Sequence, residues 1–139
     1  MRTLAGTWRI TVPQGEGNPE QFEALHTFFA DGNWSEINSG KDANHGVWSG
    51  AGDNYQLTFE GYTFDAQGKH SGSIQVRAAI ELRDSDHLTA RWVQDLIDRQ
   101  GKVTEKAYFG VFTGTRMTVE NAGVAPAAAL VGSTANTAP

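Results

Sequence analysis

His26 is the side chain in this chain best placed to do acid–base chemistry inside a folded protein. It lies in the apolar run 22–29 and shares parity with Phe28, so both point inward or neither does. The opposite face, with Leu25 and Phe29, is almost as apolar, and the sequence leaves open which face points inward. Neutral imidazole can donate or accept a proton near pH 7, so His26 is the candidate catalytic residue if the protein is an enzyme. The alternative is a buried histidine that only satisfies local hydrogen bonds.

Two carboxylates are weaker candidates. Glu36 shares parity with Trp34 near an expected barrel mouth, and Asp95 lies late in a later strand. Each is otherwise an ordinary carboxylate on a strand. The histidines have no spacing that places three on one face, so no zinc site or other metal site is expected. The remaining three stand at turns or strand ends, where exposure is the rule: His45, His70 and His87.

Composition excludes several classes of function. The chain has no cysteine, which removes disulfides, thiolate metal sites and cysteine nucleophiles. It carries neither a nucleophile elbow nor a phosphate-binding glycine loop, so no cofactor is expected. A net charge of −5 with scattered Lys and Arg argues against nucleic acid. No apolar run is long enough to cross a bilayer, and the first residues do not resemble a signal peptide, so a cytoplasmic protein without a membrane partner is expected.

Short alternating segments separated by Gly, Asn and Asp turns predict an all-β chain. The turn 30–33 (Ala-Asp-Gly-Asn) is a strong hairpin signal, because Asp-Gly accepts positive φ. Residues 13–19 and 38–44 are predicted polar loops. The predicted strands are 4–12, 22–29, 34–37, 46–49, 55–64, 71–83, 88–97 and 103–119.

The strand 71–83 has the most regular alternation in the chain. Its even positions, from Ile74 to Leu82, are aliphatic or small, whereas its odd positions include Arg77 and Glu81. The ordinary interpretation turns the aliphatic face into the core. The inverse would place Arg77 and Glu81 in a polar cavity and cover the aliphatic face with another protomer, so homo-oligomer formation is left open.

Trp8 near the start of the first strand and Arg116 near the end of the last indicate how the sheet closes. Eight antiparallel strands form either an up-and-down barrel or a sandwich. In a closed barrel the first and last strands are neighbours, and the guanidinium of Arg116 can then lie over the indole of Trp8. This pair favours a single eight-stranded barrel over residues 1–120, followed by a flexible Ala- and Thr-rich tail over 121–139.

The combination of Gly6-Thr7-Trp8 with a terminal Arg116 resembles the calycin group, the lipocalins and fatty-acid-binding proteins. Those families place a Gly-x-Trp on the first strand and pack it against an arginine of the last. This chain has no Thr-Asp-Tyr segment, no helix before its last strand and no two-helix lid. The resemblance implies a compact lipocalin-like barrel with a ligand cavity and a mouth shaped by loops.

An eight-stranded barrel has room for side chains or for one small ligand. One interpretation is a core plugged with aromatic residues. The other, which the resemblance favours, is a pocket for a small hydrophobic molecule of aromatic, polyene or polyketide-like character. A cofactor-independent isomerase or cyclase acting on such a ligand is the alternative function. The expected ligand-binding residues are Phe28, Trp34, Trp48, Phe59, Tyr62, Trp92 and Tyr108.

Overall fold

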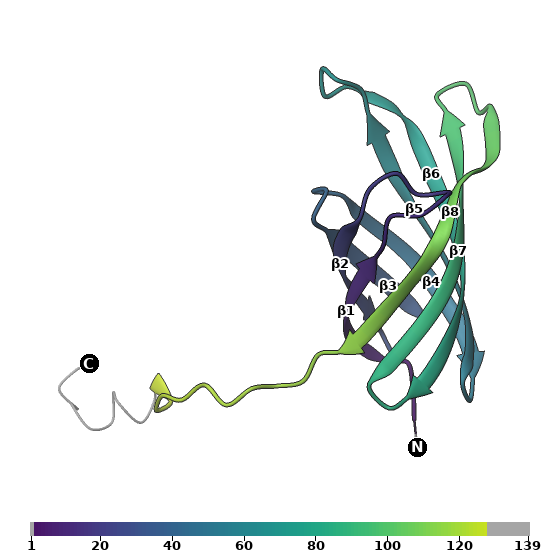
Figure 1. Ribbon diagram of the computed structural model, residues 1–139. Helices are drawn as coiled ribbons and strands as arrows, with labels where there is room; N and C mark the ends of the chain where they lie inside the picture. Colours follow the sequence, from purple (N-terminus) through teal and green to yellow (C-terminus); the bar gives the residue numbers. More distant parts are fainter. Residues whose placement is uncertain (1, 128–139) are drawn as a thin grey trace.

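The computed structural model describes residues 2–127, which contain eight antiparallel strands closed into a barrel (Figure 1). Each strand pairs with the next, and the first pairs with the last. The predicted eight-stranded up-and-down barrel is therefore confirmed, and a sandwich is excluded. The strands are β1 (Gly6–Val12), β2 (Phe22–Phe28), β3 (Asn33–Asn38), β4 (Ala43–Ala51), β5 (Asn54–Phe64), β6 (His70–Asp84), β7 (His87–Asp98) and β8 (Val103–Arg116).

Two strand boundaries differ by three residues from the sequence-based prediction, and the others agree to within two residues. β4 begins at Ala43 rather than at residue 46, because Ala43 and Asn44 continue the ladder with β3. The end of the predicted loop 38–44 is thus strand. β8 ends at Arg116 rather than at residue 119, because β7 begins at His87, opposite Thr115, and offers no strand residue beyond it. On the β1 side, only the hydrogen bond from the Met117 N–H to the Thr7 carbonyl continues past Arg116 among the described residues.

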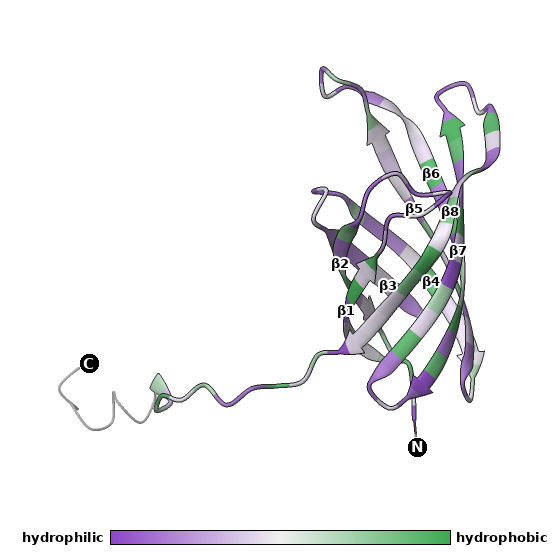
Figure 2. Cartoon of the chain, in the orientation of Figure 1, coloured by the Kyte–Doolittle hydropathy of each residue, from purple (hydrophilic) through white to green (hydrophobic). Residues whose placement is uncertain are grey.

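Hydrophobic and hydrophilic residues alternate along the strands (Figure 2), and the buried hydrophobic ones point into the interior. On β6, the side chains of Val76, Ala78, Ile80 and Leu82 are buried, whereas Glu81 is exposed. The ordinary interpretation of this strand is therefore correct, and the inverse one is wrong. On β2 the face that carries His26 points inward, which decides the question the sequence left open.

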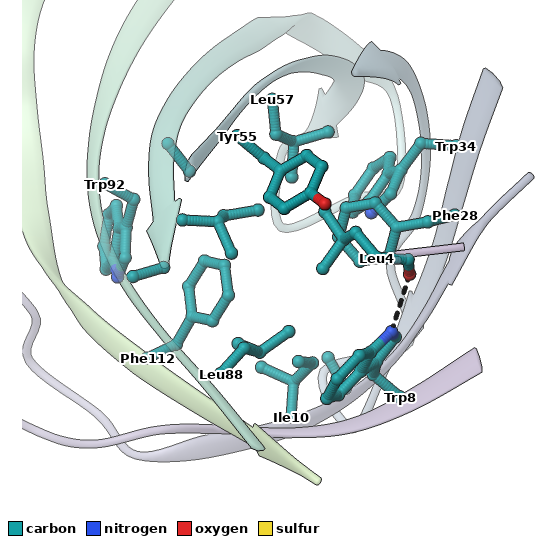
Figure 3. Packing of buried hydrophobic residues seen from close by; sticks show 14 of the residues in the cluster. Leu4, Trp8, Ile10, Phe28, Trp34, Tyr55, Leu57, Leu88, Trp92 and Phe112 are labelled. Carbon is teal, nitrogen blue, oxygen red and sulfur yellow. Dashed lines mark hydrogen bonds between the residues drawn. The ribbon is translucent and has the colours of Figure 1, made fainter. Parts of the chain in front are cut away.

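The predicted contact between Trp8 and Arg116 is present at one end of the barrel. The two residues are cross-strand partners, and the guanidinium carbon lies 4.5 Å from the centroid of the indole. Arg116 also donates to the carbonyl oxygens of Thr3, Ala5 and Ser85. Trp8 Nε1 donates to the carbonyl of Leu4 at 3.0 Å (Figure 3). The N-terminal residues and the last strand together seal this end.

Residues 117–127 follow β8 and leave the barrel wall (Figure 1). The expected tail, 121–139, lies for its larger part outside the described residues. No helix in the described part of the chain is both long and apolar enough to cross a membrane.

Asp95 belongs to the outer wall, where it holds an irregular stretch of β8 against β7. The register shifts between Gln94 and Leu96. The Asp95 carboxylate accepts hydrogen bonds from both terminal nitrogens of Arg77, at 2.8 and 3.3 Å, and from the backbone N–H of Lys106 at 2.9 Å. Lys106 has a positive φ of 51°. These contacts give Asp95 a structural role.

The Asp95 contacts predict a specific loss of stability in acid. The Arg77 hydrogen bonds, followed by the Lys106 N–H, hold the pKa of Asp95 below its usual range. Because the folded-state pKa is depressed, the stabilisation is present above the unfolded-state pKa of about 3.9 and is lost as pH falls through the folded-state pKa. Asp95→Asn is therefore expected to lower the melting temperature at pH 7, with a gap that narrows as pH falls below about 4. Asp53→Asn is the matched control, because Asp53 forms an exposed ion pair with Arg2. A gap for Asp95→Asn that stays constant across this pH range would contradict the assignment.

Candidate functional site

A cavity of about 480 Å³ opens at the end of the barrel opposite Trp8 and Arg116. The connections β1–β2 and β3–β4 and the end of β5 contribute to its rim. The lining comes from strands on all sides of the barrel and combines apolar side chains with polar ones such as Asn38, Thr63 and Gln94. The apolar lining residues are Val12, Pro19, Phe22, Phe59, Phe64, Ile74, Val76, Trp92 and Phe112.

Three polar side chains form a buried row on the cavity wall: His26, Glu36 and Asn44. They lie on the adjacent strands β2, β3 and β4, and the register pairs His26 with Glu36 and Glu36 with Asn44. His26 Nε2 lies 3.1 Å from one Glu36 carboxylate oxygen, and Asn44 Nδ2 donates to the other at 2.6 Å. Their exposed fractions are 2%, 6% and 4%. The Glu36 carboxylate is thus held from both sides.

Aromatic rings surround the His26 end of this row. The imidazole packs edge-on against Trp34 and Phe112, with ring centroids 4.8 and 5.4 Å away. Its Nδ1 is buried without a hydrogen-bond partner among the described residues, as is Trp34 Nε1. Because Nε2 faces the Glu36 carboxylate, it carries the proton in a neutral ring, which leaves Nδ1 as a bare acceptor. This is the imidazole's only free nitrogen, and it is buried.

Two glycines make room for the row and its aromatic surroundings. A Cβ at Gly61 would overlap the side-chain amide of Asn44. Gly46 lies in register between Trp34 on β3 and Phe59 on β5, and the two rings stack across it with centroids 4.4 Å apart. Larger residues at either position would displace the groups that form the cavity floor.

Four of the seven expected ligand-binding residues line the cavity. Phe59 and Trp92 lie in its wall, and the Trp92 indole donates to the carbonyl of Val111. Tyr108 and Tyr62 lie near the mouth. Tyr62 is 71% exposed and contacts His70 edge-on.

The other three, Phe28, Trp34 and Trp48, do not line the cavity. They pack against one another beneath it. Phe28 contacts Trp34 edge-on at 6.4 Å (Figure 3) and Trp48 edge-on at 5.8 Å. Trp48 also donates to the carbonyl of Phe29 at 2.9 Å. The sealed half of the barrel is therefore filled with side chains, whereas the half near the mouth is hollow.

Sequence reasoning missed one member of the polar row, Asn44, because it was assigned to a loop. The alternation Asn44, Gly46, Trp48 extends the strand backwards and contains the signal. It also missed the pairing of His26 with Glu36, although the hairpin turn 30–33 brings them opposite each other. Within residues 2–127, no three His, Asp or Glu side chains are grouped so that they could hold a metal ion.

The fold and the site define an all-β barrel with a part-hollow interior and a buried His–Glu–Asn row. No family model matches the chain, and neither the curated proteins nor the solved structures contain a significant match.

Proposed function

We propose that this protein binds a small hydrophobic molecule, of aromatic, polyene or polyketide-like character, in the cavity. The observation that carries the proposal is the cavity of about 480 Å³, walled by aromatic and aliphatic side chains and open at one end. Ligand sites of folded proteins commonly measure about 300–1,000 Å³ and combine apolar walls with few polar groups. Phe59, Trp92 and Phe112 supply rigid rings that lose little conformational entropy on binding.

We also propose that the barrel is lipocalin-like and belongs with the calycin group. The consecutive strand order, the closure of β1 on β8 and the Trp8–Arg116 contact support this assignment. The barrel is filled beside that contact and open at the opposite end, and this arrangement supports a barrel that carries a ligand.

A cofactor-independent isomerase or cyclase is the second candidate function, and the His26–Glu36–Asn44 row favours it. Such an enzyme folds a flexible substrate into its reactive conformer, and orientation alone can supply up to about 7–11 kcal/mol. The Glu36 carboxylate would take a proton from an acidic C–H and return it to another carbon of the same molecule. Asn44 and His26 hold the carboxylate in place, so the isomerisation needs no external reactant.

Three further expectations from the sequence stay predictions: a cytoplasmic location, the absence of nucleic-acid and membrane partners, and homo-oligomer formation as an open alternative to a monomer. Cell fractionation tests the first, and light scattering during gel filtration tests the last.

Titration of a broad panel of apolar ligands tests the binding proposal. Because Trp92 lies in the cavity wall, bound ligands are expected to shift or quench tryptophan emission. Ile74 points into the cavity, so Ile74→Phe narrows it and is expected to weaken binding by about tenfold or more. Ala79→Phe places the same ring on the exposed face of β6 and should bind like wild type.

A panel that leaves the emission of the wild type unchanged would refute the binding proposal. Equal binding by the Ile74→Phe and wild-type proteins would place the ligand elsewhere. Product analysis of the bound ligand by mass spectrometry and chromatography then separates a carrier from an isomerase. A carrier returns the ligand unchanged, whereas the enzyme converts it at a rate that falls in Glu36→Gln.

A further inference from the structure

Apart from His26, the ionisable side chains that line the cavity are carboxylates and two tyrosines. Three carboxylates line it, Glu20 and Asp42 at the exposed rim and Glu36 within, and none of its lining residues is a lysine or an arginine. Glu20 and Asp42 take part in none of the ion pairs formed by residues 2–127. The lining is therefore net negative whether His26 is neutral or protonated.

The hydrogen-bonding groups of the buried row also favour a ligand that donates hydrogen bonds. His26 Nε2 and one Asn44 N–H, the donors nearest to the carboxylate, are both directed at Glu36. A carboxylate has about four acceptor positions, and these two bonds occupy two of them. Glu36 thus keeps acceptor capacity next to a cavity whose other lining donors are neutral amides and hydroxyls, such as those of Gln94 and Tyr108.

The aromatic side chains in the wall also favour a positively charged ligand. The faces of Trp92, Phe59 and Phe112 are electron-rich, and a cation near such a face is attracted by the ring quadrupole. Apolar walls also strengthen the attraction of Glu36 for a cation, because they exclude water. A ligand carboxylate would instead meet three like charges without a basic partner.

We propose that the ligand of this cavity carries a basic amine on its hydrophobic body, with the ammonium group directed at Glu36. This inference rests on the proposed binding function and names the chemical class of the ligand. It sets the cavity apart from sites that hold fatty acids through basic side chains. The apolar body lies against Trp92 and Phe112, and the rim carboxylates attract the charged ligand before it enters.

Three probes with one body and different head groups test the proposal: 4-phenylbutylamine, 4-phenylbutanol and 4-phenylbutyrate. Affinities are measured by calorimetry with the full-length protein at pH 7 and low salt. The amine is expected to bind at least about tenfold more tightly than the carboxylate. A hydrogen bond to a charged group is stronger than a neutral one by about this order, and only the amine can donate such a bond to Glu36. The alcohol is expected to lie between them.

Two variants locate the origin of the preference. Glu36→Gln removes the buried charge and is expected to reduce the amine-to-carboxylate ratio to a few-fold. The rim double variant Glu20→Gln/Asp42→Asn changes only exposed residues, so it keeps the fold, and it is expected to reduce the ratio mainly at low salt. Glu81→Gln, on the exposed face of β6, is the control and should keep the wild-type ratio.

The outcomes separate this inference from the function on which it rests. Equal affinity for all three probes, or tightest binding of the carboxylate, overturns the amine preference and leaves the hydrophobic cavity site standing. Binding of none of the three overturns both. An amine preference that survives in Glu36→Gln and in the rim variant overturns the role given to these carboxylates.

Discussion

The Trp8→Ala protein is expected to lose about 4–6 kcal/mol of its free energy of unfolding. Trp8 is fully buried, and truncation of a buried tryptophan costs about 3–5 kcal/mol. The variant also loses the cation–π contact with Arg116, worth about 0.5–2 kcal/mol, and the hydrogen bond to Leu4. The loss is comparable to the total stability of a small domain at the lower end of the usual range.

Urea denaturation followed by circular dichroism measures this loss without relying on tryptophan emission. Trp8→Phe keeps most of the buried volume and should lose far less. Arg116→Ala removes the guanidinium that lies over the Trp8 ring and is expected to lower the free energy of unfolding by about 2–3 kcal/mol. Ligand affinity is expected to stay unchanged, because Trp8 and Arg116 lie at the sealed end. An unfolding midpoint of Trp8→Ala equal to that of wild type would contradict the closure of the barrel through this pair.

His26→Phe is expected to reduce the free energy of unfolding by about 2–4 kcal/mol. The phenyl ring retains the contacts with Trp34 and Phe112, but the Glu36 carboxylate loses the donor on one of its oxygens. A buried charge that loses its hydrogen-bonded partner is strongly destabilising, by a few kcal/mol. Thermal and urea denaturation measure the effect.

A double variant separates the charge from the packing. Glu36→Gln in the His26→Phe background removes the stranded charge and is expected to restore about 1 kcal/mol or more. His45→Phe, at an exposed position on β4, is the control and is expected to change the free energy of unfolding by no more than about 0.5 kcal/mol. If His26→Phe changes neither stability nor ligand binding, His26 is a bystander and the site depends on shape and aromatic contacts alone.

The fold could be predicted because the signals that specify it are local. Alternation of period two marks the strands, and turns such as 30–33 fix which strands pair. Trp8 and Arg116 add the one long-range signal, which selects a closed barrel over a sandwich. The boundaries of β4 and β8 were less predictable, because a strand ends where its neighbours stop pairing.

The site was predicted less completely, for two physical reasons. The parity of the run 22–29 was ambiguous, since both faces are apolar; the structure shows Leu25 and Phe29 at 38% and 47% exposure, with His26 buried. The second reason is that the sequence does not show how deep along the barrel axis an inward-pointing side chain lies. Parity places Trp34 and Trp92 in the interior alike, but only the fold shows that Trp34 lies in the filled half and Trp92 beside the cavity.

The central claim is that the open half of the barrel holds a ligand while the sealed half does not. The indole N–H signals of Trp8 and Trp92, observed by ¹⁵N NMR during titration with 4-phenylbutylamine, test it most directly. The structure places Trp92 in the cavity wall and Trp8 at the far, sealed end. The Trp92 signal is expected to shift progressively to saturation while the Trp8 signal stays in place. Unchanged signals at ligand excess, or a shift of Trp8 without one of Trp92, would contradict the account.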